Sequence, residues 1–115
     1  MTDKVTTHTA EDDPRNQDIL IWVNGVLKPR EEALVSVYDS GFMLGDGVWE
    51  GLRLHHGAVV FLKDHLRRLY QGAKSLDLDI GLTSEELTQR LNDTLQANDM
   101  HDGVHIRLMV TRGEK

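Results

Sequence analysis

The stretch VWEGLRLHHGAVVFLKDHLRRLYQGAKSL, residues 48–76, contains the change of pattern that decides the fold. Residues 48–55 predict a strand. The pair His56-Gly57 then predicts a turn, and residues 58–62 predict an antiparallel partner strand. Over residues 65–76 the apolar residues recur at helical spacing, and Asp64 is a suitable N-cap for that helix. We therefore expect a strand, a turn, a second strand and a helix in this order.

A second hairpin is predicted upstream of this stretch. Residues 19–23 form an apolar, β-rich run, and Asn24-Gly25 separates it from a second short run at Val26-Leu27. Asn-Gly favours a tight type I′ turn, because both of its central positions need a positive φ. Residues 41–47 are rich in glycine, and we expect irregular backbone there.

Downstream, the pattern predicts one more helix and one more strand. Ser84 opens the helix, and Glu85 and Glu86 follow in its first turn, where the helix dipole favours acidic side chains. From Val104 to Val110 apolar and polar residues alternate. The order is β-β-β-β-α-α-β, so we expect an α+β fold with a mainly antiparallel sheet and two helices. Residues 1–18 are poor in apolar side chains and are expected to form a flexible tail, which leaves residues 19–115 as the folded domain.

Composition and charge exclude several classes of protein. The 115 residues carry a formal net charge of −6, which argues against a nucleic-acid partner. The chain has no cysteine, and its six histidines form no metal-binding motif, so disulfides, thiol chemistry and a metal site are not expected. No apolar run is long enough for a membrane helix, and the first residues do not resemble a secretory signal. We therefore expect a cytoplasmic protein without a membrane partner.

Two predicted strands carry arginine on one of their faces. Trp49, Gly51 and Arg53 share a face of the strand that begins at Val48, and Arg107 lies between aliphatic residues on the last strand. An aromatic wall, an open space above glycine and a guanidinium group suit a small ligand that carries a carboxylate. The same residues also fit a structural interpretation, in which Trp49 belongs to the core and Arg53 is solvated. Alternation alone favours the structural interpretation.

Four stretches of the chain carry a family signature. The longest is DSGFMLGDGVWEGLR at residues 39–53, and the others are IWVNG at residues 21–25, HLRRL at residues 65–69, and the strand from residue 105 that ends in TRG at residue 113. Together they resemble the N-terminal part of the class IV aminotransferases, the fold-type IV enzymes that depend on pyridoxal phosphate. That family includes branched-chain and D-amino-acid aminotransferases and aminodeoxychorismate lyase. The stretches keep the family's order and spacing over nearly all of residues 19–113.

The resemblance implies roles for five residues. Arg68 matches the arginine that binds the phosphate of the cofactor, although its helical position alone would suit a solvated arginine equally well. Trp49, Arg53 and Arg107 match residues that shape the substrate pocket, and Leu44 matches a loop residue that reaches the partner subunit's active site. Branched-chain members usually have tyrosine at the position of Leu44 and proline directly after the position of Arg107, and this chain has leucine at both places.

The resemblance also implies the function of the intact protein. It implies a homodimeric aminotransferase that moves an amino group between an amino acid or amine and a 2-oxo acid. The family's catalytic lysine lies in a following larger domain, and none of Lys4, Lys28, Lys63, Lys74 and Lys115 matches it. We therefore expect this chain to be the small N-terminal domain, without the catalytic C-terminal domain, and to be inactive alone. An aminodeoxychorismate lyase-like enzyme and a non-catalytic module that retains the fold are the alternatives.

Overall fold

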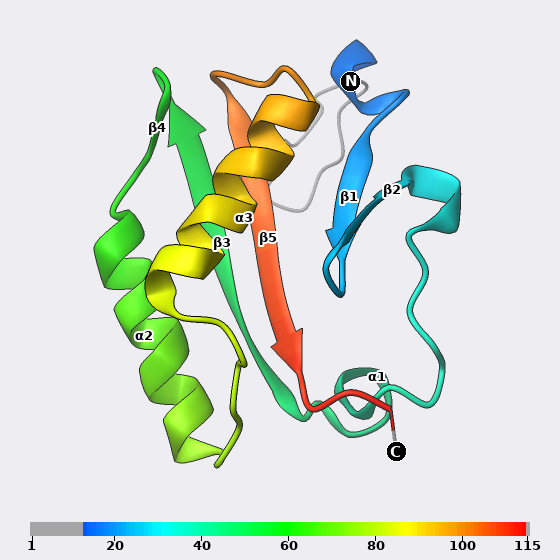
Figure 1. Ribbon diagram of the computed structural model, residues 1–115, viewed down its shortest axis with the longest axis vertical. Helices are drawn as coiled ribbons and strands as arrows, with labels where there is room; N and C mark the ends of the chain where they lie inside the picture. The colour runs from blue at the N-terminus through cyan, green and yellow to red at the C-terminus, as the bar shows by residue number, and fades with distance from the viewer. Residues whose placement is uncertain (1–12, 115) are drawn as a thin grey trace, which may run out of the picture.

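Two antiparallel sheets organise the protein, for which a computed structural model describes residues 13–114 (Figure 1). The first sheet is a hairpin of two strands, and the second has the spatial order β4-β3-β5. The strands are β1 (Leu20–Val23), β2 (Val26–Pro29), β3 (Gly47–His55), β4 (Ala58–Val59) and β5 (Val104–Thr111). The helices are α1 (Ser40–Leu44), α2 (Leu62–Ser75) and α3 (Ser84–Ala97), with short 3-10 helices at η1 (Pro14–Asn16) and η2 (Arg30–Glu32). The α+β class and the antiparallel pairing are confirmed.

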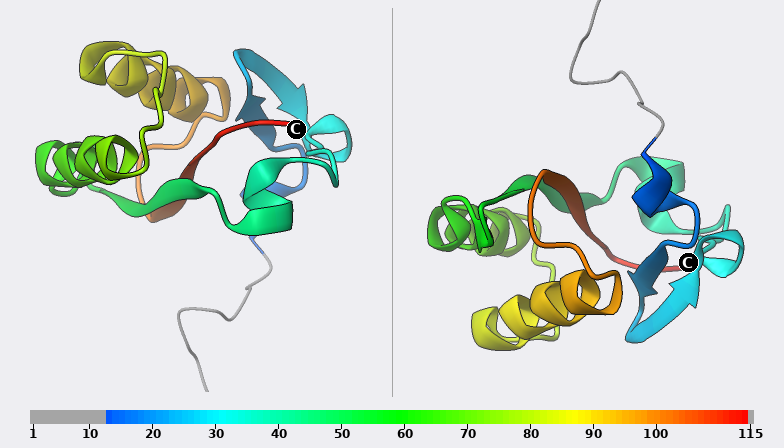
Figure 2. Two further views of the ribbon diagram at one scale, coloured as in Figure 1. Left: turned by 90° about the horizontal axis from the view of Figure 1, so that it is seen from below. Right: turned by 90° about the horizontal axis from the view of Figure 1, so that it is seen from above.

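The core lies between one face of the three-stranded sheet and the two long helices. Leu52 of β3 is completely buried, and Leu66 and Leu69 of α2 pack with Leu87 of α3. Gly72 allows α2 to approach the sheet closely, because a Cβ at this position would lie 3.2 Å from Cγ1 of Val48. The two end-on views show α2 and α3 together on one side of the sheet (Figure 2).

The β1–β2 hairpin is held to the rest of the domain through the end of α3. Asn24 and Gly25 have φ angles of 50° and 92°, as the predicted tight turn requires. The side chain of Asn98, which follows α3, accepts a hydrogen bond from the Leu20 amide at 2.7 Å and donates one to the Leu20 carbonyl at 2.9 Å. The predicted hairpin is confirmed, and the two hydrogen bonds between the Asn98 side chain and the Leu20 backbone hold β1 beside the end of α3.

The structure corrects the predicted start of α2. The helix begins at Leu62, three residues earlier than expected, and its N-cap is Phe61 in a left-handed conformation with φ 54°. Asp64 is therefore not the cap; it lies in the first turn, where its carboxylate pairs with Arg67 at 2.7 Å. The reason is that β4 pairs with β3 over two residues only, so the chain is free to turn into a helix after Val59.

The glycine-rich stretch of residues 41–47 is not irregular throughout, because it contains most of α1. Asp39 caps this helix, with its carboxylate accepting from the Gly41 amide at 2.8 Å. Gly45 ends the helix in the left-handed conformation that glycine adopts without strain, with φ 67°. A capping aspartate at one end and a glycine at the other stabilise a single helical turn that apolar periodicity could not reveal. The described residues thus contain three α-helices, where two were expected.

Part of the predicted tail is ordered. The expected flexible segment covered residues 1–18, of which residues 1–12 lie outside the described residues. In the described part, Asp13 caps η1, and Arg15 donates hydrogen bonds to the carbonyls of Asp102 at 2.7 Å and Gly103 at 3.0 Å. This anchor is polar, so a count of apolar residues missed it. Within residues 13–114 no helix combines the length and apolar character that a membrane span requires.

Candidate functional site

A buried carboxylate lies at the centre of the sheet. Glu50 is on the face of β3 that is covered by α2, and it is only 5% exposed. Arg68 donates to it twice, from Nε to Oε2 at 2.9 Å and from Nη2 to Oε1 at 2.6 Å. His65 Nδ1 lies 2.6 Å from the same Oε1. His65 and Arg68 are one helical turn apart on α2, so both can reach one carboxylate. We call these three residues the Glu50 cluster.

The contacts within the Glu50 cluster shift its ionisation. The hydrogen bonds from Arg68 hold the pKa of Glu50 below its ordinary value, His65 lowers it further, and burial opposes both. The same contact with Glu50 raises the pKa of Arg68. Glu50 was not among the site residues predicted from the sequence. The available signal was a glutamate on the otherwise apolar face of β3, between Val48 and Leu52, where an unpaired carboxylate would be costly.

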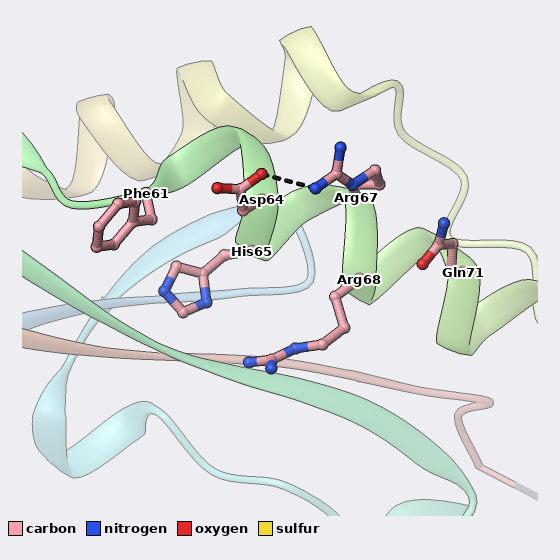
Figure 3. Close-up of a pocket in the computed structure, with 6 residues that line it drawn as sticks. All are labelled: Phe61, Asp64, His65, Arg67, Arg68 and Gln71. Carbon is pink, nitrogen blue, oxygen red and sulfur yellow. Dashed lines mark hydrogen bonds and ion pairs between the residues drawn. The ribbon is translucent and has the colours of Figure 1, made fainter.

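Arg68 also faces solvent. Its side chain is 71% exposed and borders an open cavity of about 430 Å³. In Figure 3 the side chains of His65 and Arg68 point toward β3, whereas Arg67 points away from it. The residues that line this cavity are Phe61, Asp64, His65, Arg67, Arg68 and Gln71. Asp64 pairs with Arg67 and Glu50 pairs with Arg68, so the suitability of this cavity for an anion depends on the exposed guanidinium of Arg68.

The other three predicted pocket residues on the sheet lie together on its opposite face. The guanidinium carbon of Arg107 is 4.4 Å from the centroid of the Trp49 ring, which is a cation–π contact. Arg53 is paired with His105 across the two strands, and Gly51 is paired with Arg107. Trp49 is 56% exposed, so the alternative that placed it in the core is wrong. The predicted common face of Trp49 and Arg53 is present, and the pairing of Gly51 with Arg107 places Arg107 on it as well.

Leu44 belongs to neither of these two groups of contacts. It is the last residue of α1 and is 58% exposed. Its neighbours Phe42 and Met43 on the same helix are also exposed. The described contacts do not join Leu44 to Trp49, although only four residues separate them in the chain.

The structure does not bring Arg68 into one cavity with Trp49 and Arg107. Arg68 contacts Glu50, and successive side chains on a strand point to opposite faces, so Trp49 lies across β3 from the Glu50 cluster. The cavity beside Arg68 is lined by none of the three residues on the Trp49 face. The resemblance implied one site for these residues, but within residues 13–114 Arg68 and the Trp49 face open onto different surfaces.

One edge of β3 connects the two faces. β4 pairs only with Leu54 and His55, so from Gly47 to Leu52 this edge has no strand partner among the described residues. The Arg53 carbonyl accepts from the Val60 amide at 2.9 Å and therefore points toward the β4 side. By alternation the backbone groups of Gly51 and Trp49 point to the same side. A ligand at this edge could contact Arg68 on one face and Trp49 on the other.

The chemistry of these groups suits anion binding rather than metal binding. Glu50 occupies Nε and Nη2 of Arg68, which fixes the plane of the guanidinium, and Nη1 has no hydrogen-bond partner among the described residues. An arginine oriented in this way is well suited to a phosphate group. No group of three or more metal-ligating side chains occurs within residues 13–114.

Comparison with known proteins gives concordant matches. Residues 47–115 match the model of the family "Amino-transferase class IV". A putative branched-chain-amino-acid aminotransferase of Methanocaldococcus jannaschii is 48% identical to this chain, and the match covers 81% of this chain and 32% of the relative. The D-alanine aminotransferase of Bacillus licheniformis is 36% identical, and that match covers 79% of this chain and 32% of the relative. A solved branched-chain amino acid aminotransferase from T.th., in complex with N-(5'-phosphopyridoxyl)-L-glutamate, has a TM-score of 0.77 at 33% identity over 86% of this chain and 34% of that one. The chain spans about a third or less of the length of the curated relatives it matches.

Proposed function

The chain belongs to the class IV aminotransferase family, and from this premise we propose that it is the small N-terminal domain of a pyridoxal-phosphate-dependent aminotransferase. The intact enzyme moves an amino group between an amino acid or primary amine and a 2-oxo acid. The solved relative that holds a phosphopyridoxyl ligand supports the choice of cofactor. When bound, pyridoxal phosphate acts as the electron sink for chemistry at the α-carbon of the amino acid.

Arg68 binds the 5′-phosphate of the cofactor in this proposal. The observation that carries it is the bidentate contact with buried Glu50, which holds an otherwise exposed guanidinium in one plane at the rim of an open cavity. A guanidinium whose rotamer is already fixed loses less entropy when it binds a phosphate. Glu50 is thus a positioning residue for Arg68.

Trp49, Arg53 and Arg107 form one wall of the substrate pocket. Their common face offers an aromatic surface and two guanidinium groups. The space above Gly51 is not open as the sequence suggested, because a Cβ there would lie 3.2 Å from Cε1 of His105. A substrate of this enzyme class carries a carboxylate, which arginine binds with paired hydrogen bonds. The unpartnered edge of β3 allows the phosphate site and this wall to serve one bound molecule.

Leu44 lies at the interface of the proposed homodimer, near the partner's active site. Exposed apolar residues on a short helix support this assignment, because an apolar surface of this kind is commonly covered by another protein surface. The residues that contribute are Phe42, Met43 and Leu44. We place the homodimer in the cytoplasm.

The catalytic lysine belongs to another part of the intact enzyme. No lysine lines the cavity beside Arg68 among the described residues; Lys28 is on β2, and Lys63 and Lys74 are on α2. A transamination site needs an amine that holds the cofactor and moves a proton. We therefore propose that the isolated chain does not catalyse amino transfer.

Adjacent arginines provide a matched test of the phosphate site. In the intact protein, Arg68→Gln should weaken binding of pyridoxal phosphate by at least about tenfold, because a charge-assisted contact is lost. Arg67→Gln should have little effect, because Arg67 points away and pairs with Asp64. Equal effects of the two substitutions would contradict the assignment.

Cofactor binding is followed by its visible absorbance, and amino transfer by assay with L- and D-amino acids. Pyruvate release without an amino acceptor would indicate the lyase alternative, and failure to bind the cofactor the non-catalytic one.

A further inference from the structure

The exposed face of β3 carries a glycine between two large side chains. Gly51 lies between Trp49 and Arg53 on this face, and a glycine inside a strand commonly marks a place where another group approaches the backbone closely. Gly51 is paired with Arg107, so His105 is its diagonal neighbour on β5. The approaching group is the imidazole ring of His105, because a Cβ at Gly51 would lie 3.2 Å from Cε1 and 3.7 Å from Nε2 of that ring.

Packing, and not hydrogen bonding, holds the imidazole ring over Gly51. His105 is exposed, and neither nitrogen of its ring has a hydrogen-bond partner among residues 13–114. A Cβ at Gly51 would also lie 3.9 Å from Cζ3 of Trp49, so the indole and the imidazole border the same small space. The guanidinium of Arg107 stacks on the indole at 4.4 Å. These three side chains form one layer over the sheet, and a molecule at this wall contacts that layer instead of the Gly51 backbone.

We propose that His105 is a specificity-determining residue, whose ring sets the depth of the substrate pocket above Gly51. The proposal rests on the proposed function, in which this face is one wall of that pocket. The carboxylate of a substrate binds the guanidinium groups of the wall, and the rest of the molecule lies against the aromatic rings. A substrate side chain that points toward β3 stops at the imidazole. Without the imidazole, the same side chain can extend to the backbone of the glycine.

The expected size of the effect follows from the steric role of the ring. One methylene group that finds or lacks room in an apolar pocket changes kcat/KM by about tenfold or more. Removal of the imidazole frees room for such a group, and the neighbouring side chains relax into part of that room. We therefore expect His105→Ala to raise the kcat/KM of a long amino donor, relative to that of a short one, by about tenfold.

The test uses the intact enzyme and straight-chain amino donors of increasing length, from 2-aminobutyrate to 2-aminooctanoate, in the enantiomer that the enzyme accepts. His105→Phe keeps the bulk of the ring and loses both nitrogens, so it should keep the wild-type ratio of kcat/KM values. Gly51→Ala added to His105→Ala places a methyl group in the vacated space and should return the ratio toward the wild type. His101→Ala is the matched control, at an exposed histidine that pairs with Asp99 at 2.8 Å, and should equal the wild type.

A binding measurement separates pocket depth from the chemical step. Straight-chain carboxylic acids have no amino group to transfer, so their affinity for the intact protein reports on the pocket alone. Isothermal titration should show that His105→Ala favours the longer acids over the shorter ones by a similar factor. An unchanged order of affinities would overturn the proposal.

The kinetic outcomes distinguish the proposal from the function on which it rests. An unchanged ratio in His105→Ala would overturn the proposal while amino transfer itself stays in place. An equal shift in His105→Phe would also overturn it, because the bulk of the ring is then not the cause. If the wild type transferred no amino group from any donor, the proposed function would fail first. Should His105→Ala not fold, His105→Val suits a strand and should shift the ratio in the same direction, and an unchanged ratio there would overturn the proposal.

Discussion

Replacement of Glu50 by glutamine should destabilise the domain by about 1–2 kcal/mol at pH 7. Glu50 accepts three hydrogen bonds while only 5% exposed, two from Arg68 and one from His65. Glutamine keeps the shape but presents an amide N–H₂ where an acceptor is needed. A hydrogen bond to a charged group contributes about 1.5–3 kcal/mol in a buried setting. The expected loss of stability is smaller than the sum of three such bonds, because the Arg68 side chain is largely exposed and water can replace part of its contact with Glu50.

The pH dependence of this loss provides the sharper test. The pKa of Glu50 is lowered in the folded state, chiefly by Arg68, so its stabilisation is fully present above the unfolded glutamate pKa of about 4.3. It is lost as the pH falls through the lower folded value. Urea unfolding of the chain at several pH values between 7 and 3, followed by circular dichroism, should therefore show the gap between wild type and Glu50→Gln closing at the acid end. Glu31→Gln, at an exposed position on η2, is the control. A gap that stays constant with pH, or equals that of the control, would refute the reasoning.

Three further substitutions test how local elements are held. Thr83→Ala removes the capping box of α3, in which Thr83 and Glu86 exchange hydrogen bonds of 3.0 and 3.1 Å. The free energy of unfolding, measured in urea, should fall by about 1 kcal/mol, and no change would show that the cap is dispensable. Gly47→Ala should lower the free energy of unfolding by roughly 2 kcal/mol in the same assay, because the new Cβ would lie 2.6 Å from the oxygen of the Val110 carbonyl. An unchanged stability would mean that β3 and β5 can separate at this position. Arg15→Ala should speed hydrogen exchange at the amides of η1 but not of β3, and unchanged exchange would refute the anchoring role of Arg15.

Periodicity predicted the strands and long helices of this fold because each of them buries one face. β5 alternates from Val104 to Val110, and α2 carries Leu66, Leu69 and Ala73 on its buried side. The elements that were missed depend on polar capping. α1 is held by Asp39 and Gly45, and η1 by Asp13 and Arg15, and none of these contacts leaves a repeating apolar pattern in the sequence.

The candidate site also contains a part that the sequence predicts and a part that it does not. Alternation placed Trp49 and Arg53 on one face of β3 correctly, because side-chain direction on a strand follows from parity alone. It could not reveal that Glu50 binds Arg68, since that contact depends on where α2 crosses the sheet. The spacing of His65 and Arg68 on one helical face was visible, but their shared partner was not. A charged residue among buried leucines on a strand is the signal that would have directed attention to Glu50.

The register of β3 couples the two halves of the proposed site. Trp49 and Glu50 are consecutive, so one points to the exposed face and the other to the face under α2. A shift of one residue between β3 and β5 would exchange them, which would place an indole beside Arg68 and a carboxylate beside Arg107. The phosphate anchor would then lose its partner, and a carboxylate-binding wall would gain a negative charge. Gly47 opposes such a shift, because its backbone lies against Val110 more closely than any side chain would allow. The pairing register of β3 with β5 thus determines on which face each functional group lies.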